Sequence, residues 1–308
     1  MTDATAALAA RARCPACLHA PLSVGGDVLA CTACGARWPL LSRQPLAVRL
    51  GEEGLEALGE QFEAPAPARS RARRAVRRWH ARRDEAFAPR IPALAESQLP
   101  VVRGAYDALP AGGRAVLDVG GGAGRWHGLL GGPPDYTIVD VIPPQRVPLA
   151  PGITYVQADA TSLPFSGGSF GLVLMIEVLH HLKDPATALA EARRVLADGG
   201  SLVLTTRQAW RTLAPSDYFR FTRYGLEHLL HSAGLAERRV LALGGPASVF
   251  AVTLESNVRP LGKPLVKQLV THPLWRLAAL LDRTVFRDEL TGPTPDVSGW
   301  LVVATPAG

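Results

Sequence analysis

The sequence predicts an α/β protein built on a mostly parallel sheet, with a small metal-binding module in front of it. Four cysteines, arranged as two C-x2-C pairs, gather within residues 14–34. A glycine-rich turn at residues 120–124 separates a short apolar run from an amphipathic one, and further apolar runs alternate with helical patterns down the chain. With 47% hydrophobic and 19% charged residues over 308 positions, the chain can bury the core that such a fold needs.

The positive charge of the chain is concentrated in one segment. Lys and Arg number 33 against 27 Asp and Glu, which gives a formal net charge of +6. Residues 69–83 contain eight arginines and no acid, so the rest of the chain holds 25 basic and 27 acidic residues. A basic segment attracts polyanions such as RNA, but an arginine-rich composition also arises without any such partner. Composition therefore leaves the partner open.

The N-terminus and the apolar runs indicate the compartment. Residues 1–13 are alanine-rich and lack the basic start and the long apolar stretch of a signal peptide. No run approaches the ~18 uninterrupted apolar residues of a transmembrane span. We therefore expect a soluble, cytoplasmic protein whose cysteines stay reduced.

The four cysteines predict a structural zinc site. Cys14 and Cys17 form the first pair, Cys31 and Cys34 form the second, and Gly35 suits the backbone turn after the last thiolate. Two such pairs supply the four sulfur ligands of a tetrahedral zinc ion and leave no open position for catalysis. Disulfides and a thioredoxin-like redox pair are the alternatives, and two symmetric pairs in a cytoplasmic protein disfavour both.

A connector follows this module. Residues 63–68 are rich in Pro and Ala, which predicts a stiff, extended spacer. The arginine run after it has Ala72, Val76 and Trp79 at helical spacing, which predicts a helix with one apolar stripe and an arginine-rich face. The stripe favours a helix that docks on the protein itself, and RNA or an acidic lipid surface is the alternative partner of the arginine face.

The glycine-rich turn is the most informative stretch. Residues 115–119 are typical of a buried parallel strand, and a helix is expected from about Arg125. The glycines between them let backbone amides approach a ligand closely. A dinucleotide-binding turn would need glycine or alanine in place of Arg125, and no Gly-Lys-Ser/Thr of a P-loop follows. The pattern that remains is Asp118-x-Gly120-x-Gly122-x-Gly124.

This pattern resembles motif I of the class I S-adenosylmethionine (SAM) dependent methyltransferases, and the chain downstream continues the resemblance. The resemblance spans about residues 100–243 and resumes at 299–305, the expected closing strand. Within it, residues 163–185 resemble the loop, fourth strand and turn of the subgroup that methylates small molecules. It implies a Rossmann-like α/β fold with a seven-stranded sheet, mostly parallel, whose last strand is antiparallel.

The resemblance implies SAM as the cofactor and assigns residues to it. Asp140 ends the second strand, 136–140, where the family's carboxylate accepts the ribose hydroxyl protons. Asp159 and Ala160 follow the third strand, where the family places a carboxylate and a backbone amide on the adenine. The full expected cofactor-binding set is Asp118, Gly120, Gly122, Gly124, Asp140, Asp159, Ala160 and Glu177.

Residues 14–50 resemble the small zinc-ribbon module that occurs alone as a methyltransferase activator or fused to methyltransferases. This second resemblance implies a structural Zn2+ ion held by the four cysteines. The expected organisation is a zinc ribbon at 1–50, the spacer and arginine-rich connector at 51–99, and a methyltransferase domain at 100–308. Residues 244–298 are long for a link between two strands, and we expect them to form a helical insertion that caps the acceptor site, with an interfacial membrane helix as the alternative.

One position departs from the family. The family usually has an acid at the start of the fourth strand, where Gly171 stands. Because Asp118, Asp140 and Asp159 all remain, we expect the change to affect local structure more than cofactor binding.

Missing residues narrow the choice of acceptor. All cysteines lie in the ribbon, which disfavours methylation of pyrimidine C5 through a covalent thiolate adduct. Residues 176–179 read Ile-Glu-Val-Leu and lack the Asn/Asp-Pro-Pro-Tyr that grips a planar amide or amine. Methyl transfer from a sulfonium requires alignment and exclusion of water. An oxygen or carbon acceptor is therefore expected.

Four residues are candidates for the acceptor side of the site. His180 and His181 follow the fourth strand at the rim where parallel sheets bind ligands, and either is a candidate general base or a simple lining residue. Tyr218 and Arg220 precede a helix for which Thr222 is the expected cap, and they are candidates for the acceptor wall. Arg220 suits an acidic acceptor, with a packing ion pair as its alternative role.

These observations together predict a SAM-dependent methyltransferase that carries a structural zinc ribbon and acts on a small molecule. The first alternative is an rRNA or tRNA methyltransferase that holds RNA with the ribbon and residues 69–83. The second is a scaffold that binds SAM without turnover.

Overall fold

The computed structural model describes residues 3–43, 46–50, 92–110, 113–210, 212, 216–258, 272–285 and 296–308. Its strands are β1 (Ser23–Gly25), β2 (Val28–Ala30), β3 (Arg37–Arg43), β4 (Leu46–Arg49), β5 (Val116–Val119), β6 (Tyr136–Asp140), β7 (Ile153–Gln157), β8 (Phe170–Ile176), β9 (Leu196–Arg207), β10 (Leu235–Leu243) and β11 (Gly299–Pro306). Its helices are α1 (Asp3–Arg11), α4 (Pro92–Asp107), α5 (Arg125–Leu129), η2 (Pro144–Arg146), η3 (Leu179–His181), α6 (Pro185–Val195), α7 (Arg223–Ser232), α8 (Pro246–Val258) and α10 (His272–Thr284).

Seven strands form the sheet that the sequence predicts. Their order is β7-β6-β5-β8-β9-β11-β10, and β7, β6, β5, β8 and β9 run parallel to one another. The last strand, β11, lies antiparallel between β9 and β10. This arrangement confirms the Rossmann-like α/β fold with its antiparallel closing strand.

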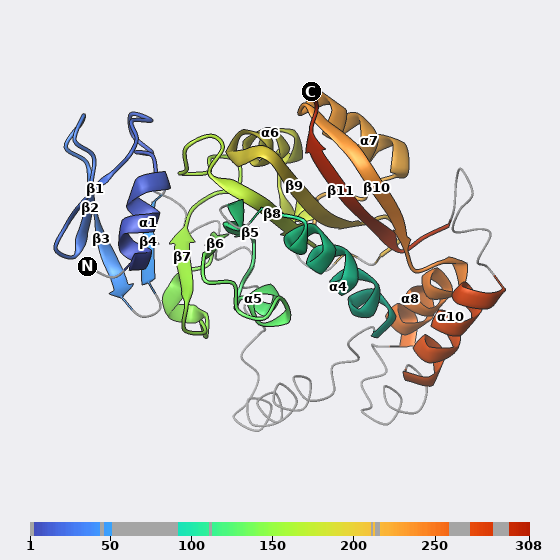
Figure 1. Cartoon of the computed structure of the whole chain (residues 1–308). Helices are drawn as coiled ribbons and strands as arrows, with labels where there is room; N and C mark the ends of the chain where they lie inside the picture. Colours follow the sequence, from blue (N-terminus) through green and yellow to red (C-terminus); the bar gives the residue numbers. More distant parts are fainter. Residues whose placement is uncertain are drawn as a thin grey trace, which may run out of the picture.

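The N-terminal strands extend this sheet to eleven strands, so the expectation of seven strands beside a separate ribbon is corrected. β4 pairs in parallel with β7, with Leu46 opposite Thr154 and Arg49 opposite Gln157. Antiparallel pairing then adds β3, β2 and β1 outward from β4. An edge strand exposes unpaired amide and carbonyl groups, and β4 satisfies those of β7. Helix α1 and strands β1 to β4 together form the N-terminal module. Figure 1 shows this module at one end of the sheet, beside β7.

Alternating side chains divide the core into two layers, one on each face of the sheet. On β5, Leu117 and Val119 belong to the layer that α1, α6 and α7 cover, and Val116 belongs to the layer that α4 and α5 cover. Successive side chains of a strand point to opposite faces, so a strand buried on both faces is apolar throughout. The central strands of this sheet follow that pattern except at a few buried polar residues, such as Asp118 on β5 and Thr205 on β9.

The connector lies mostly outside the described residues. The Pro/Ala spacer at 63–68 and the arginine run at 69–83 both fall there, so the expected connector helix stays a prediction. The described chain resumes at Pro92 with α4, whose Val102 and Tyr106 are buried against the sheet. The expected start of the catalytic domain at residue 100 therefore falls inside this helix.

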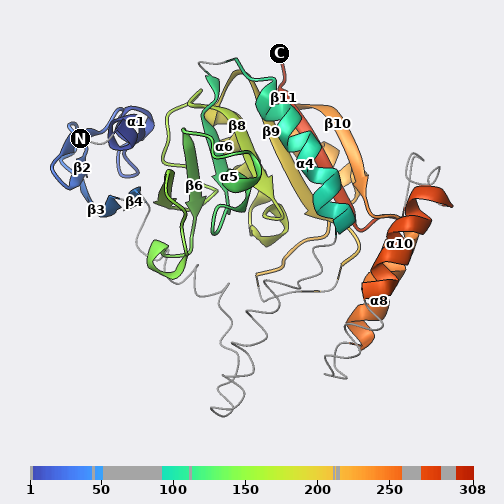
Figure 2. The same cartoon turned by 60° about the horizontal axis from the view of Figure 1, so that its bottom comes forward.

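The segment 244–298 contains α8 and α10, which pack against each other at the end of the sheet opposite the N-terminal module (Figures 1 and 2). Ala251 and Trp275 are buried between them, and Trp210 from the end of β9 packs against the pair. Asp282 of α10 accepts hydrogen bonds from the amides of Gly245, Ala247 and Ser248 and so caps the start of α8. None of the helices described has the length and apolar character that a bilayer span requires.

Gly171 stands where a neighbouring backbone leaves no room for a side chain. A Cβ at this position would lie 1.9 Å from the carbonyl oxygen of Gly113 and 3.2 Å from Cδ1 of Leu109. The departure from the family pattern is therefore explained by close backbone approach at the start of β8.

We predict that Gly171→Ala destabilises the protein by about 2 kcal/mol or more, because overpacking against backbone cannot relax through a side chain. Urea unfolding of the variant and the wild type measures the difference. Gly104→Ala in α4 is the matched control, since a Cβ there meets nothing within 4 Å, and it is expected to stabilise by about 0.5–1 kcal/mol. Equal effects of the two substitutions would contradict this explanation.

Candidate functional site

A cavity of about 370 Å3 lies at the carboxyl ends of the parallel strands β5, β6, β7 and β8. This is the edge where open parallel sheets bind ligands, and the volume lies within the usual range of ligand pockets, about 300–1,000 Å3. Eight of the residues that the sequence singled out line it: Gly120, Gly122, Asp140, Asp159, Ala160, Glu177, His181 and Tyr218. The remaining candidates, Asp118, Gly124, His180 and Arg220, lie outside this lining.

The glycine turn after β5 is held tightly against its neighbours. Gly120 has a φ of +69°, and its amide donates to the carbonyl oxygen of Val139 on β6 at 2.6 Å. A Cβ on Gly120 would lie 2.5 Å from a methyl group of Val178. Both the positive φ and the contact with Val178 exclude a side chain at this position. The turn therefore brings backbone to the cavity wall.

Asp140 joins this turn to the end of β6. Its carboxylate accepts hydrogen bonds from the amide of Gly122 at 3.1 Å and from the amide of Ile142 at 3.0 Å. Burial raises the pKa of Asp140, and these amide hydrogen bonds oppose the rise. A carboxylate has about four lone-pair positions, so the two amides leave acceptor capacity at the cavity.

Asp118 is placed behind the glycine turn. The side chain is buried, and its carboxylate accepts a hydrogen bond from the Tyr136 hydroxyl at 2.6 Å. Burial raises the pKa of Asp118 to about 7, and the nearby charge of Asp140 adds to this rise. The hydrogen bond from Tyr136 acts in the opposite direction and lowers the pKa. The Asp118 carboxylate packs directly against the glycine turn at Gly121. Sequence reasoning missed its partner Tyr136, because the two residues meet only when β5 and β6 pair.

Asp159 and Ala160 begin the loop that follows β7. Asp159 accepts a hydrogen bond from the amide of Thr161 at 2.8 Å, which shapes the start of the loop. Thr161 also lines the cavity. The loop thus presents a carboxylate and backbone to the cavity beside Asp140, as the sequence predicts for an adenine-binding loop.

Glu177 lines the cavity in a constrained conformation. Its φ is +61°, which costs a non-glycine residue roughly 1–2 kcal/mol. Its carboxylate accepts from the Thr205 hydroxyl at 3.0 Å and forms an ion pair with Arg207, whose guanidinium stacks over Trp210 at 4.1 Å. Sequence reasoning missed Thr205 and Arg207, because they lie on β9 and no local pattern marks them. These contacts fix the Glu177 side chain at the cavity wall.

The two adjacent histidines have different surroundings. His180 is fully buried, and neither ring nitrogen has a hydrogen-bond partner within the described part of the chain. Burial, with the nearby charges of His181 and Arg207, lowers the pKa of His180 to about 3, so the ring is neutral near pH 7. His181 lines the cavity, and its Nδ1 lies 3.1 Å from the carbonyl oxygen of Ser216. A carbonyl only accepts, so Nδ1 is the donor in this contact.

Tyr218 and Arg220 also differ in their position relative to the cavity. Tyr218 lines the cavity, and its amide donates to the carbonyl oxygen of His180 at 2.9 Å. Arg220 donates to both carboxylate oxygens of Asp217 and to the carbonyl oxygens of Trp210 and Phe219. The structure therefore shows Arg220 in a packing ion pair, which was the alternative role expected for it. Thr222 caps α7, as predicted, and accepts from the Gly225 amide at 3.2 Å.

The four cysteines meet at a second site. The Sγ atoms of Cys14, Cys17, Cys31 and Cys34 all lie within 4.8 Å of one another, and none forms a disulfide. The separations are 3.5 Å between Cys14 and Cys34 and 3.6 Å between Cys17 and Cys31. Gly35, with a φ of +74°, donates its amide to the carbonyl oxygen of Cys31 and closes the second turn.

The fold and the cavity together define an α/β protein with a ligand-sized cavity at the carboxyl edge of its parallel strands. Comparison with known sequences refines this class. Residues 117–204 match the family described as "Methyltransferase domain". An uncharacterized methyltransferase of Mycobacterium tuberculosis (strain ATCC 25177 / H37Ra) is 32% identical over 183 residues, which cover 54% of this chain and 69% of the relative. The chain belongs to the class I SAM-dependent methyltransferases.

Two further comparisons show the extent of the similarity. An uncharacterized methyltransferase of Mycobacterium sp. (strain KMS) is 38% identical over 135 residues, covering 41% of this chain and 50% of the relative. The chain thus spans about half the length of that relative. The solved complex between the Haloferax volcanii Trm112 methyltransferase activator and a methyltransferase has a TM-score of 0.48 and 18% identity, and covers 73% of this chain and 94% of that one. This structural likeness is remote and identifies neither an acceptor nor a partner.

We predict that Asp118→Asn flattens the dependence of stability on pH. The folded pKa of about 7 lies above the unfolded value of about 3.9, so Asp118 binds its proton more tightly in the folded state. Its contribution to stability is therefore greatest below about pH 4 and is lost as the pH rises through about 7. The stability of Asp118→Asn relative to the wild type should increase between pH 5 and pH 8 in urea unfolding. Asp198→Asn, at an exposed position of β9, is the control and should have the same dependence of stability on pH as the wild type. The raised pKa of Asp118 would be contradicted if Asp118→Asn showed that same dependence.

Proposed function

We propose that the cavity binds SAM and that the protein transfers its methyl group to a small-molecule acceptor at oxygen or carbon. The observation that carries this proposal is the Asp140 carboxylate, fixed at the cavity wall by the amides of Gly122 and Ile142. With two lone-pair positions engaged, it retains acceptor capacity for the two ribose hydroxyls of a nucleoside.

The other walls of the cavity fit the remaining parts of the cofactor. Asp159 and Ala160 offer a carboxylate and a backbone amide for the adenine ring. The turn at Gly120 brings backbone close enough for the methionine part of SAM, and Asp118 supports the turn from behind. Bound SAM supplies an electrophilic methyl group on a sulfonium, and the chain's own residues must orient the acceptor and exclude water.

His181 is the residue that we assign to proton transfer from a hydroxyl acceptor. Its Nδ1 is directed to the Ser216 carbonyl, so Nε2 is the ring nitrogen that we assign to receive the proton. His180 is buried beside His181, outside the cavity lining, and is assigned a packing role. For a carbon acceptor His181 would act as a lining residue.

The residues after β8 and around Tyr218, on the acceptor side of the cavity, are of mixed character. Val178, Leu182 and Tyr218 contribute apolar surface to the lining, and Lys183 and Asp184 contribute charged groups. Arg220, the residue expected to hold an acidic acceptor, is committed to Asp217. α8 and α10 contribute no described residue to the lining, so the proposal does not depend on a helical cap.

We also propose that the four cysteines hold a structural Zn2+ ion. A tetrahedron with Zn–S bonds of about 2.3 Å separates its sulfurs by about 3.8 Å, and the Sγ separations of 3.5 Å and 3.6 Å approach this value. Four thiolates occupy every position of a tetrahedral ion, so the ion would stabilise the N-terminal module and take no part in methyl transfer.

We predict that the purified protein binds S-adenosylhomocysteine and that Asp140→Ala weakens this binding at least about 100-fold, since two charge-assisted hydrogen bonds to the ribose are lost. Isothermal titration calorimetry measures both dissociation constants. Asp198→Ala, at an exposed position away from the cavity, is the control and should bind as the wild type does. Unchanged affinity in a folded Asp140→Ala protein would refute the assignment of this site.

The zinc proposal predicts one equivalent of zinc per chain. Cys31→Ser should lose the metal and lower the melting temperature, because a metal-stabilised module loses the binding free energy of its ion. Thr32→Ala lies in the same turn, removes no thiolate and should retain the metal. Elemental analysis and a thermal melt report both results, and a metal-free wild type as stable as the metal-treated protein would exclude the site.

A further inference from the structure

The N-terminal module contacts the loop after β7 as well as the edge of the sheet. Ala12 forms an antiparallel bridge with Phe165, and both residues are fully buried. On either side of Ala12, the amide of Arg13 donates to the carbonyl oxygen of Pro164 at 3.1 Å, and the amide of Ser166 donates to the carbonyl oxygen of Arg11 at 2.7 Å. The backbone of residues 11–13 is thereby fixed to residues 164–166.

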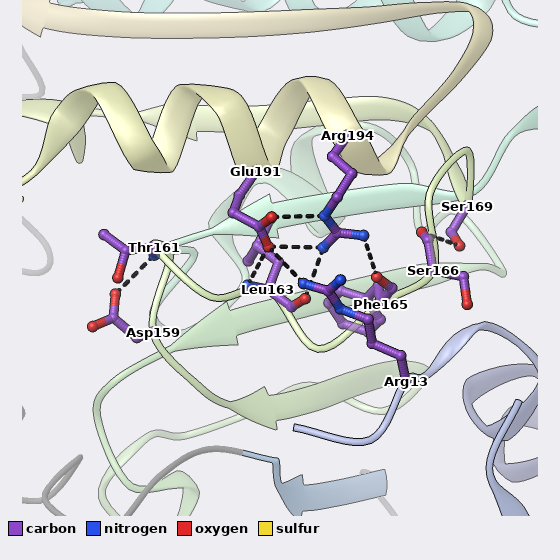
Figure 3. A network of polar contacts seen from close by, with 9 residues as sticks. All are labelled: Arg13, Asp159, Thr161, Leu163, Phe165, Ser166, Ser169, Glu191 and Arg194. Atoms are coloured by element: carbon purple, nitrogen blue, oxygen red, sulfur yellow. Dashed lines mark hydrogen bonds and ion pairs between the residues drawn. The ribbon is translucent and has the colours of Figure 1, made fainter. Parts of the chain in front are cut away.

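Side chains reinforce this contact through Glu191 of α6 (Figure 3). Its Oε2 accepts hydrogen bonds from Arg13 at 3.2 Å, from Arg194 at 2.7 Å and from the amide of Leu163 at 2.8 Å. Burial alone would raise the pKa of Glu191, but hydrogen bonds and charge from Arg194, the Leu163 amide and the charge of Arg13 lower it below its ordinary value. The carboxylate is therefore ionised at neutral pH and holds both arginines.

The same network fixes the path of the loop. Arg194 donates to the carbonyl oxygens of Leu163 and Phe165 at 2.9 Å and 2.6 Å. Leu163 and Phe165 are themselves buried in the core layer that contains α1 and α6. One end of the loop is thus held by a network that includes Arg13, and its other end, at Asp159, Ala160 and Thr161, forms a wall of the cavity.

Arg13 is also bonded directly to the cysteine site, because the next residue is Cys14. The Cys14 side chain is buried, its Sγ lies in the four-cysteine cluster, and its amide donates to the carbonyl oxygen of His19 at 2.8 Å. A change in the cysteine cluster therefore reaches Arg13 through one peptide bond. A short chain of contacts thus joins the cysteine site to the cavity. It runs from Cys14 to Arg13 along the backbone, from Arg13 through Glu191 to Leu163 by hydrogen bonds, and then along the loop to Asp159.

We propose that Arg13 is a positioning residue that couples the cysteine site to the cofactor cavity, so that zinc binding and cofactor binding strengthen each other. This inference rests on the proposed function, since it concerns the same cavity and the same cysteines. When the cluster holds its metal, Arg13 is set against Glu191 and the loop is fixed in the conformation that lines the cavity. Linkage is reciprocal, so a bound cofactor must then raise the affinity of the cluster for zinc by the same factor.

The test compares two neighbouring arginines in the zinc-loaded full chain. Both side chains are 17% exposed and both form an ion pair with the body of the protein, Arg13 with Glu191 and Arg11 with Asp135. Only the ion pair of Arg13 reaches the loop through Glu191. Arg13→Gln should weaken the binding of S-adenosylhomocysteine about threefold to tenfold in calorimetry, the effect of losing one partly buried charge-assisted contact, whereas Arg11→Gln should bind as the wild type does.

Removal of zinc provides the second arm of the test. Chelation should weaken S-adenosylhomocysteine binding by the wild type and by Arg11→Gln, and it should have a smaller effect on Arg13→Gln, because residues in one network are not additive. Equal dissociation constants for Arg13→Gln and Arg11→Gln would overturn the proposal. A wild type that fails to bind S-adenosylhomocysteine at all would instead contradict the proposed function.

A measurement on the wild type alone keeps the proposal testable if Arg13→Gln does not fold. Amide hydrogen exchange of residues 159–166 should be slower in the zinc-loaded protein than in the chelated protein, because the loop loses its attachment when the cluster relaxes. The amides of β10, at the far edge of the sheet, serve as the internal control. Equal exchange of residues 159–166 with and without zinc would overturn the coupling.

Discussion

The hydrogen bond from the Gly122 amide to the Asp140 carboxylate, 3.1 Å long, is the contact on which the site depends. It joins the turn after β5 to the end of β6, and the bond from the Gly120 amide to Val139 holds the same two strands together one step earlier. A buried carboxylate needs such amide partners, because desolvation disfavours its charge. Glycine is required at Gly120 because the backbone there passes close to Val178 and leaves no room for a side chain. The acid and the glycines are therefore one unit.

The N-terminal module gives the sheet a different edge from the one that the family pattern implies. A seven-stranded sheet would end at β7, and here β4 pairs with β7 and carries three more strands with it. The loop that begins at Asp159 follows β7 directly, so the module is attached to the strand and also to the loop that leaves it. The described residues of the N-terminal module are absent from the cavity lining, but residues 11–13 contact the loop whose other end lines it.

Local patterns in the sequence predicted most of the fold and the lining of the cavity. The acid-glycine turn, Asp140 at the end of an apolar run, and the two cysteine pairs carry their information within a few residues. Gly120, Gly122 and Asp140 line the cavity and the four cysteines meet, whereas Asp118 and Gly124 lie outside the lining. Contacts between distant segments were not predictable. The choice between His180 and His181 depends on which ring the short η3 turn directs into the core. The choice between an acceptor role and an ion pair for Arg220 depends on how Asp217 is placed, which no local pattern predicts. The pairing of β4 rests on a four-residue strand that has no distinctive pattern.

The central claim is that the cavity at the ends of β5, β6 and β7 is the cofactor site. Hydrogen exchange of the full chain with and without saturating S-adenosylhomocysteine tests this claim most directly, because it reports every segment at once. The structure predicts slower exchange within residues 118–124, 139–143 and 158–162, where amides line or support the cavity, and no change in β10. Protection confined to other segments, or none at a saturating concentration, would contradict the account.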